Sequence, residues 1–328
     1  MKKSEPKISI PPVYFNHLYV VLDDKTYRAI QGSDFLRIAF PGVERRATLT
    51  AAGETWYGSY FYCKDNYLEF FGESTGPLMG TAARSGHWQV GAQEGWAGLA
   101  FSTDQPGGVS AVREAIEMRY GFEPFSELRQ MQTSEKTINW FYHVRLAERL
   151  GLGSFESWVM EYHPEVFAHK NIHLPSNGQL TRLAYLSSWN QERKQVDETI
   201  PPKTTEPQQS VPKKETGASR PPGSVHQPVF TRVTGATIHM DATRAGRFAE
   251  ILEMLGYAKT ASGDQVSLSA HGFSLDIQPE ECAPEGYRLS KLRLAMSRPS
   301  VAPMTFVFAP HSKMILREDL TAEWVFGV

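Results

Sequence analysis

A histidine and a glutamate in the first quarter of the chain have side chains and surroundings that suit metal chemistry. His17 lies in the apolar run VYFNHLYVVL, and Glu69 lies in YLEFF. Both runs are typical of strands, whose side chains repeat every two residues, so both residues can point to the same side of a curled sheet. Neutral imidazole and carboxylate are good ligands for Zn²⁺, Fe²⁺, Mn²⁺ or Ni²⁺. The pair is therefore a candidate site for a divalent metal.

The elements around this pair are expected to form a βαβββ unit. A strand at Val13–Leu22 leads to Asp23 and Asp24, which can cap a short helix at Lys25–Gln31. A second helical turn at Asp34–Phe40 ends at a Pro-Gly pair. Turn residues then separate three further strands, at Arg45–Thr50, Thr55–Cys63 and Tyr67–Phe71.

The same order of elements returns along the chain, which predicts repeated modules. A second copy has a strand at Trp96–Thr103, a helix after Gly107-Gly108 and strands at Phe125–Thr133, Thr137–Leu146 and Ser157–His163. A third, fainter copy begins with a strand at Val233–Met240 and a helix capped by Asp241, and strands at Gln265–Ala270 and Phe273–Ile277 follow. In its register Gly235 replaces His17, and Asp276 takes the position of Glu69. The last forty residues give four strands without a clear helix, a degenerate fourth unit.

A proline-rich stretch divides these copies into two lobes. Residues Asp197–Pro228 contain seven prolines and no Phe, Trp or Tyr, so they bury too little apolar surface to become ordered. We expect a paired βαβββ lobe over 1–196, a disordered linker over 197–228 and a degenerate βαβββ-like lobe over 229–328. The predicted fold class is α+β, with curled mixed sheets in two lobes.

Composition excludes several classes of function. The net charge is −2 and no long basic run occurs, which argues against nucleic acid and membrane surfaces as partners. No signal peptide and no apolar stretch of about 18 residues is present, so a cytoplasmic protein is expected. The two cysteines, Cys63 and Cys282, provide neither a disulfide framework nor a thiolate zinc motif.

Paired βαβββ units with His in the first strand and Glu in the fourth resemble the vicinal oxygen chelate superfamily. This group includes glyoxalase I, extradiol dioxygenases and the fosfomycin and bleomycin resistance proteins, and the nearest look-alikes are uncharacterised bacterial members. The resemblance is carried by FNHLYVVLD (Phe15–Asp23) and NYLEFFGE (Asn66–Glu73), and more weakly by WAGLAFS (Trp96–Ser102) and WVMEYH (Trp158–His163).

The resemblance implies two facing modules that each supply two ligands to one divalent metal. Such a metal acts as a Lewis acid in lyases, isomerases and dioxygenases of this type. The sequence departs from the pattern at Trp96, where a His or Gln is expected. Glu161 keeps the fourth-strand position, and His163 follows on the same strand, so the implied metal set is His17, Glu69, Glu161 and His163. Glu161 and His143 are the candidate catalytic groups.

Aromatic side chains at alternating positions predict a ligand-binding wall. Trp56, Tyr60, Trp96 and Trp140 would line the cup and hold a small molecule, although ordinary cross-strand packing explains them equally well.

Other interpretations stay open for the His17–Glu69 pair and for the whole chain. One alternative for His17 is a satisfied core residue, and one for Glu69 is a salt bridge to Arg45 or Arg46. For the whole chain, one hypothesis is a metal-dependent enzyme. The alternative is a non-catalytic resistance or sequestration protein without metal, and the departure at Trp96 favours this alternative. A scaffold that binds a protein partner, and a homodimer, are further alternatives.

Overall fold

The computed structural model describes most of both lobes. The described residues are 9–49, 55–74, 94–95, 97–146, 156–174, 179–188, 228–263, 265–280 and 288–327. The predicted linker, Asp197–Pro228, lies outside them except for Pro228. No helix in these segments has the length and apolar character needed to cross a bilayer.

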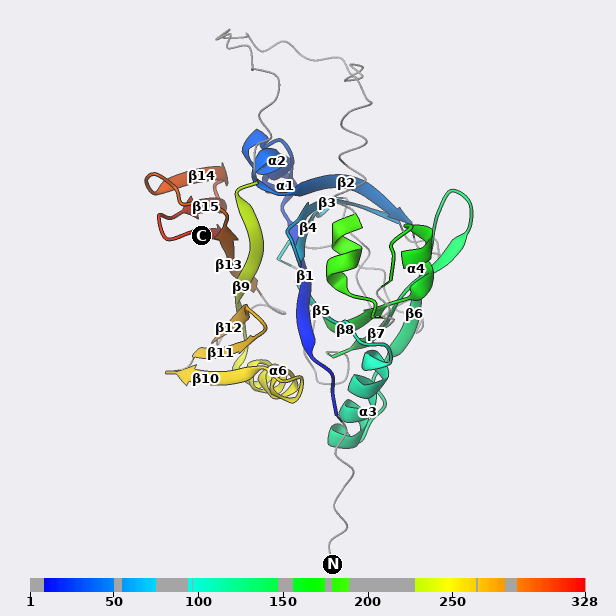
Figure 1. Cartoon of the computed structure of the whole chain (residues 1–328). Coiled ribbons are helices and arrows are strands. Elements are labelled where there is room, and N and C mark those ends of the chain that lie inside the picture. Colours follow the sequence, from blue (N-terminus) through cyan, green and yellow to red (C-terminus); the bar gives the residue numbers. More distant parts are fainter. Residues whose placement is uncertain are drawn as a thin grey trace, which may run out of the picture.

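The first eight-stranded sheet consists of two βαβββ units (Figure 1). Its elements are β1 (Val13–Leu22), α1 (Asp24–Gln31), α2 (Asp34–Ala39), β2 (Gly42–Leu49), β3 (Thr55–Tyr62), β4 (Tyr67–Gly72), β5 (Ala97–Thr103), α3 (Gly108–Tyr120), β6 (Ser126–Gln132), β7 (Thr137–Arg145) and β8 (Glu156–Tyr162). The strand order is β2-β3-β4-β1-β5-β8-β7-β6, so the first strands of the two units lie side by side in the centre. β1 runs parallel to β4 and β5 runs parallel to β8, because the crossover helices return the chain.

The second sheet repeats this arrangement, with α6 as the only helix among its described residues. Its elements are β9 (Phe230–Met240), α6 (Ala242–Met254), β10 (Ala258–Ser262), β11 (Gln265–Ala270), β12 (Phe273–Pro279), β13 (Arg288–Met296), β14 (Met304–Ala309), β15 (Ser312–Leu316) and β16 (Thr321–Phe326). The order is β10-β11-β12-β9-β13-β16-β15-β14, the same pattern as in the first sheet. These two mixed sheets confirm the predicted α+β class and the repeated modules.

The fourth unit shows what the missing helix does to the topology. β9 and β12 are parallel across α6, whereas β13 and β16 are antiparallel. No helix returns the chain after β13, so β14 starts at the end where β13 finishes. Each of β14, β15 and β16 therefore runs opposite to the corresponding strand of the other units, and neighbouring strands of this unit are antiparallel. The predicted degenerate unit is therefore a four-stranded antiparallel sheet.

A β-bulge in β1 changes the faces expected for this strand. Strict alternation predicts that Phe15 and His17 share a face, but the pairing with β5 shifts by one residue between them. Phe15 therefore joins Leu18 in the outer core, while His17 and Tyr19 face the concave side. The prediction for Phe15 was wrong because a bulge inserts a residue without a sequence signal of its own.

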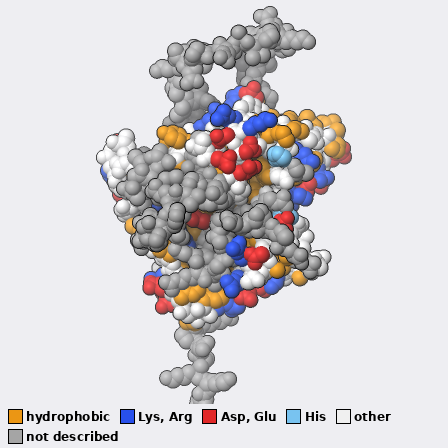
Figure 2. All heavy atoms as spheres, turned by 180° about the vertical axis from the view of Figure 1, so that it is seen from behind, with side chains coloured by type: hydrophobic (Ala, Val, Ile, Leu, Met, Phe, Trp, Pro, Cys, Tyr) orange, Lys and Arg blue, Asp and Glu red, His pale blue; other side chains and the backbone are white. Residues whose placement is uncertain are grey.

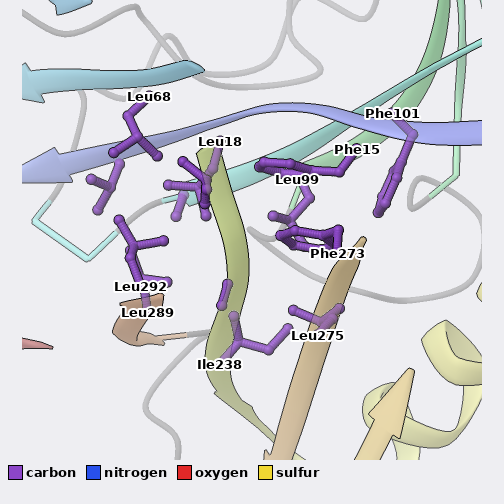
Figure 3. Close-up of a cluster of buried hydrophobic side chains, with 14 of the residues drawn as sticks. Phe15, Leu18, Leu68, Leu99, Phe101, Ile238, Phe273, Leu275, Leu289 and Leu292 are labelled. Carbon is purple, nitrogen blue, oxygen red and sulfur yellow. The ribbon is translucent and has the colours of Figure 1, made fainter. Parts of the chain in front are cut away.

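The two sheets pack against each other through their outer faces. Figure 3 shows Phe15, Leu18 and Leu99 of the first sheet directed toward Leu275 and Ile238 of the second, within one continuous core. The Phe15 and Phe273 rings stack at 3.9 Å. Polar contacts flank this core: Asn66 exchanges two hydrogen bonds of 2.9 Å with the Val233 backbone, and Asp65 pairs with Arg232.

The concave face of the first sheet, called the cup below, is covered by two helical segments of its own lobe. They are α4 (Pro164–His169) and residues 182–188. Figure 1 shows both inside the ring of strands. Phe167, Tyr185 and Leu186 are buried there against Tyr60 and Tyr162 of the sheet.

Candidate functional site

The structure brings His17 and Glu69 together on the concave face. β1 and β4 are parallel neighbours, with His17 opposite Tyr67 and Tyr19 opposite Glu69. This register places His17 Nε2 3.9 Å from Glu69 Oε1, with the side chains 7% and 15% exposed. The Tyr67 ring stacks on the imidazole at 4.4 Å. Glu69 thus keeps some access to solvent, while His17 is enclosed.

Asn16, the bulge residue, orients the imidazole. Its Oδ1 lies 2.8 Å from His17 Nδ1, and its Nδ2 donates to Ser102 Oγ at 3.0 Å and Tyr162 Oη at 3.4 Å. With both amide hydrogens directed to the second module, the Asn16 oxygen accepts from Nδ1–H. The Nε2 lone pair is then directed toward Glu69.

Burial shifts the protonation of both groups away from that of an ordinary ion pair. Burial raises the pKa of Glu69 from 4.5 to about 7, against the opposing effects of the Arg46 charge and a hydrogen bond with Tyr67. Burial, assisted by Arg46, lowers the pKa of His17 from 6.5 to about 3. At neutral pH the imidazole is therefore neutral, and the carboxyl exchanges its proton near neutrality.

Arg46 is a part of this site that the repeat comparison did not identify. Its guanidinium lies 4.1 Å over the Tyr60 ring and is 3.4 Å from both Glu44 Oε2 and Tyr62 Oη. Its charge acts on both His17 and Glu69, while its ion pair is with Glu44. Glu44 and Arg46 share one face of β2, and this period-2 pattern of charges in a strand was the available signal.

Three of the four aromatic residues predicted to line the cup pack on its concave side. Trp56 Nε1 donates to Tyr60 Oη at 3.3 Å, and both, like Trp140, belong to apolar clusters of the concave side. Trp96 lies outside the described residues. Trp158, which sequence analysis did not select, makes an edge contact with His17 at 5.5 Å and stacks on Tyr19.

Glu161 and His163 do not join the pair, because each caps a helix. Glu161 Oε1 and Oε2 accept from the backbone N–H groups of Gly107 and Val109, at 2.9 and 3.1 Å. They satisfy the first turn of α3, whose N-cap Gly107 has no side chain to do so. His163 Nδ1 accepts from Glu165 N–H at 3.1 Å and caps α4.

His143 also lies apart from the pair. It is buried between the rings of Phe125 and Phe141, and its Nδ1 has no hydrogen-bond partner within the described structure. Burial, reinforced by the charges of Arg129 and Arg145, lowers its pKa to about 3. The imidazole is therefore neutral at physiological pH and at a distance from the candidate metal ligands.

The donor set fits a divalent metal in type but not in number. His17 and Glu69 supply one nitrogen and one oxygen, whereas a bound metal usually takes three or more protein ligands. No group of three His, Cys, Asp or Glu side chains that could hold a metal occurs among the described residues. Two bonds of ~2.1 Å at a tetrahedral angle would hold the ligand atoms about 3.4 Å apart, closer than the observed 3.9 Å. The Arg46 cation also lies beside the pair.

The second sheet contains the predicted counterpart of this pair in altered form. Gly235 lies opposite Ser274, as His17 lies opposite Tyr67, and Asp276 follows two residues later. Arg293 pairs with Asp276 and donates to the Ser274 carbonyl at 3.0 Å. A Cβ at position 235 would lie 2.6 Å from the Ser274 backbone oxygen and 2.3 Å from the Arg293 guanidinium, so glycine is strongly favoured there. A guanidinium thus occupies the space of the imidazole.

The surface agrees with the balanced charge of the sequence. On the face shown in Figure 2, acidic and basic side chains are interspersed with apolar ones, and no broad basic area is visible outside the grey segments.

Comparisons with known proteins give one family match. A model described as "Family of unknown function (DUF5829)" matches residues 15–200, more than half of the chain. A search of curated proteins finds no match.

Several solved structures are similar to this chain at low identity, among them the following three. A hypothetical protein from Staphylococcus aureus has a TM-score of 0.46 and 8% identity, over 90% of this chain and 95% of that one. A mutant of 4-hydroxymandelate synthase from Streptomyces coelicolor has a TM-score of 0.39 and 11% identity, over 93% and 88%. An extradiol ring-cleaving dioxygenase from B.fuscum has a TM-score of 0.36 and 13% identity, over 85% and 56%. The order and register of the strands described above carry the fold assignment independently.

Proposed function

The chain belongs to the family of unknown function DUF5829, whose model covers the lobe that carries the His17–Glu69 pair, and we propose that this lobe binds a small molecule in its cup. Glu69 and His17 would contact the ligand and exchange a proton with it. The observation that carries this proposal is a carboxyl that titrates near pH 7, facing a neutral imidazole nitrogen 3.9 Å away.

The chemistry of the pair favours proton exchange with a ligand. A general acid or base works best when its pKa lies near the working pH, and burial has moved Glu69 to that range. Arg46 would favour an anionic or hydroxyl group of the ligand beside the pair, since its charge acts at both residues. Trp56, Tyr60 and Trp140 would supply the aromatic wall.

A ligand screen with matched variants tests this proposal. Small aromatic and carboxylic compounds would be screened by thermal shift against the wild type, Glu69→Gln and Glu161→Gln. Ligands of the cup should raise the Tm of the wild type and of Glu161→Gln, but raise the Tm of Glu69→Gln far less. A ligand that stabilises all three proteins equally would locate its binding away from the pair and refute the proposal.

A metal-dependent form of this function is the second candidate, and the Asn16–His17 hydrogen bond favours it. Histidines that ligate metals usually donate their other ring N–H to a neighbouring oxygen, as His17 does to Asn16. His17 and Glu69 would be ligands, and the bound metal would supply Lewis-acid chemistry. Elemental analysis of the natively purified protein decides this point. A first-row metal near one equivalent, lost in both His17→Ala and Glu69→Ala, would establish it, and metal-free wild-type protein from metal-supplemented cells would exclude it.

A further inference from the structure

Residues 179–188, called the plug below, fill the middle of the cup with a tyrosine. Tyr185 is 3% exposed, and its ring stacks on Tyr162 at 4.1 Å with an angle of 23°. Phe167 of α4 contacts the same ring at 6.2 Å. The phenol is thus enclosed by aromatic rings of the sheet and of α4, as a planar ligand would be.

The hydroxyl group of Tyr185 has a specific polar partner in the cup. Trp140 Nε1 donates to it at 3.1 Å, from a strand of the sheet itself. Indole N–H is a donor only, so this partner selects a group that accepts a hydrogen bond. The sheet therefore offers an aromatic wall and one fixed donor, and the phenol of Tyr185 satisfies both.

Several contacts of its side chains attach the plug to the rest of the lobe. Arg182 pairs with Asp104 at 2.7 Å, its backbone N–H also donates to Asp104, and its guanidinium lies 3.9 Å over the Tyr14 ring. Leu180 and Leu186 are buried in the same cluster as Tyr185. By contrast, α4 follows β8 after a single residue, His163, so the backbone itself fixes α4 against the sheet.

We propose that the cup contains a subsite for a phenol-type ring, which Tyr185 occupies in the closed form, and that the plug leaves the cup when a ligand enters. This inference rests on the proposed function, because it describes access to the same cup. The ligand class is a planar aromatic compound with a hydroxyl or another hydrogen-bond acceptor, which takes over the Tyr162 stack and the Trp140 donor. Release of the plug requires the Arg182–Asp104 pair to open.

The subsite is tested by chemical rescue of a truncated tyrosine. The full-length Tyr185→Ala variant would be titrated with p-cresol, which reproduces the tyrosine side chain, and with toluene, which lacks the hydroxyl. We expect p-cresol to raise the Tm and to bind about fivefold more tightly than toluene, the worth of one hydrogen bond. Tyr257→Ala is the control, since Tyr257 is a buried tyrosine of the outer core. Equal binding of both probes, or equal rescue of the control, would overturn the subsite.

Displacement of the plug is tested in chains that keep Tyr185. Arg182→Gln should accelerate amide hydrogen exchange over 182–188 by roughly tenfold, the effect of losing one partly buried ion pair. p-Cresol affinity should rise by the same factor, because apparent affinity scales with the open fraction. Asp104→Asn should reproduce both effects, and Arg113→Gln, which breaks an exposed pair with Glu123, should produce neither. Unchanged exchange, or faster exchange without tighter binding, would overturn the displacement.

These measurements do not depend on the His17–Glu69 pair. If Glu69→Gln leaves ligand binding intact while Tyr185→Ala is rescued by p-cresol, only the role proposed for the pair fails. If the rescue fails while ligands still distinguish Glu69→Gln from the wild type, only the subsite and the plug fail.

Discussion

Asn16 decides which nitrogen of His17 faces Glu69. The side chain is fully buried and its two amide hydrogens are directed to Ser102 and Tyr162, so the oxygen is left for the imidazole. The second module thereby controls the tautomer of a residue in the first.

This arrangement predicts the tautomer of His17. In the wild type the proton should be on Nδ1, and in Asn16→Ala a substantial fraction should move to Nε2 because the acceptor is lost. Ring ¹⁵N chemical shifts measured by NMR report both states. Asn16→Asp keeps the acceptor and should keep the proton on Nδ1. A wild-type imidazole protonated at Nε2 would contradict the proposed orientation of Asn16.

Glu69 should make stability depend on pH in a direction opposite to that of most carboxylates. Its native pKa of about 7 exceeds its ordinary 4.5, so between these values the native state holds a proton that the unfolded state has lost. Stability from this group is complete below pH 4.5 and is lost as the pH rises through 7, by on the order of 3 kcal/mol. His17 acts in the other direction, because its lowered pKa removes stability as the pH falls from 6.5 toward 3.

Comparison of variants separates the two contributions. The free energy of unfolding of Glu69→Gln and of the wild type would be measured in urea at pH 5 and pH 8. The value for the variant minus that for the wild type should be larger at pH 8, where the wild type carries a buried charge. A stability difference that is the same at both pH values would mean that Glu69 has an ordinary pKa.

Sequence reasoning found the pair but not its neighbours. His17 and Glu69 could be predicted because a strand period and a repeat place them on one face. Trp158 is recognised only when the register across β1, β5 and β8 is known, and register is a property of pairing rather than of any one strand. Arg46 could be predicted as a possible partner of Glu69, but its position beside His17 as well depends on the register across β2, β3 and β4. The capping role of Glu161 could not be predicted either. The N-cap residue of α3, Gly107, has no side chain, so the acceptor for the first turn comes from a distant strand.

At the scale of elements, the role of Glu161 in α3 gives a clear expectation. Glu161→Gln should lower stability by about 1–2 kcal/mol, since an amide oxygen can satisfy only one of the two N–H groups as a neutral acceptor. Thermal or urea unfolding would measure this loss. Glu117→Gln, on the exposed side of α3, should change stability little. Loss of bound metal in Glu161→Gln, without loss of stability, would instead favour the ligand role.

Most strands could be predicted, and the exceptions have physical reasons. The third unit was expected with two strands after its helix, but the structure has three, because β10 (AKTAS) is exposed along its whole length and has no apolar alternation. The bulge at Asn16 was also missed. The four strands of the last unit were expected, whereas their reversed direction follows only from the absence of a return helix.

At the scale of the whole molecule, the two lobes share one core. Trp324 of the fourth unit is fully buried and contacts Phe70 at 4.9 Å and Phe61 at 6.2 Å, both from the first sheet. The fourth unit, β13–β16, has no helix among its described residues to cover its apolar face. We infer that the first lobe supplies the apolar cover that the fourth unit lacks.

Shared burial predicts a single unfolding transition. Fluorescence and circular dichroism should give the same midpoint, since neither lobe can lose its partner without exposing its outer face. Trp324→Ala should lower the stability of both lobes together by about 3–5 kcal/mol, and Trp324→Phe should lower it by less. Two separate transitions in the wild type would show that the lobes are independent.

The fourth unit also has a consequence for synthesis on the ribosome. Its four antiparallel strands lie within residues 288–326, so their contacts are short in sequence and form rapidly. The apolar outer face of the first sheet, however, is complete after residue 162 and stays uncovered until these last strands have been synthesised. At a translation rate of roughly 5–20 residues per second, the wait is on the order of ten seconds. During that interval the nascent chain exposes Phe61 and Phe70 to solvent, so we expect it to depend most on chaperones at this stage.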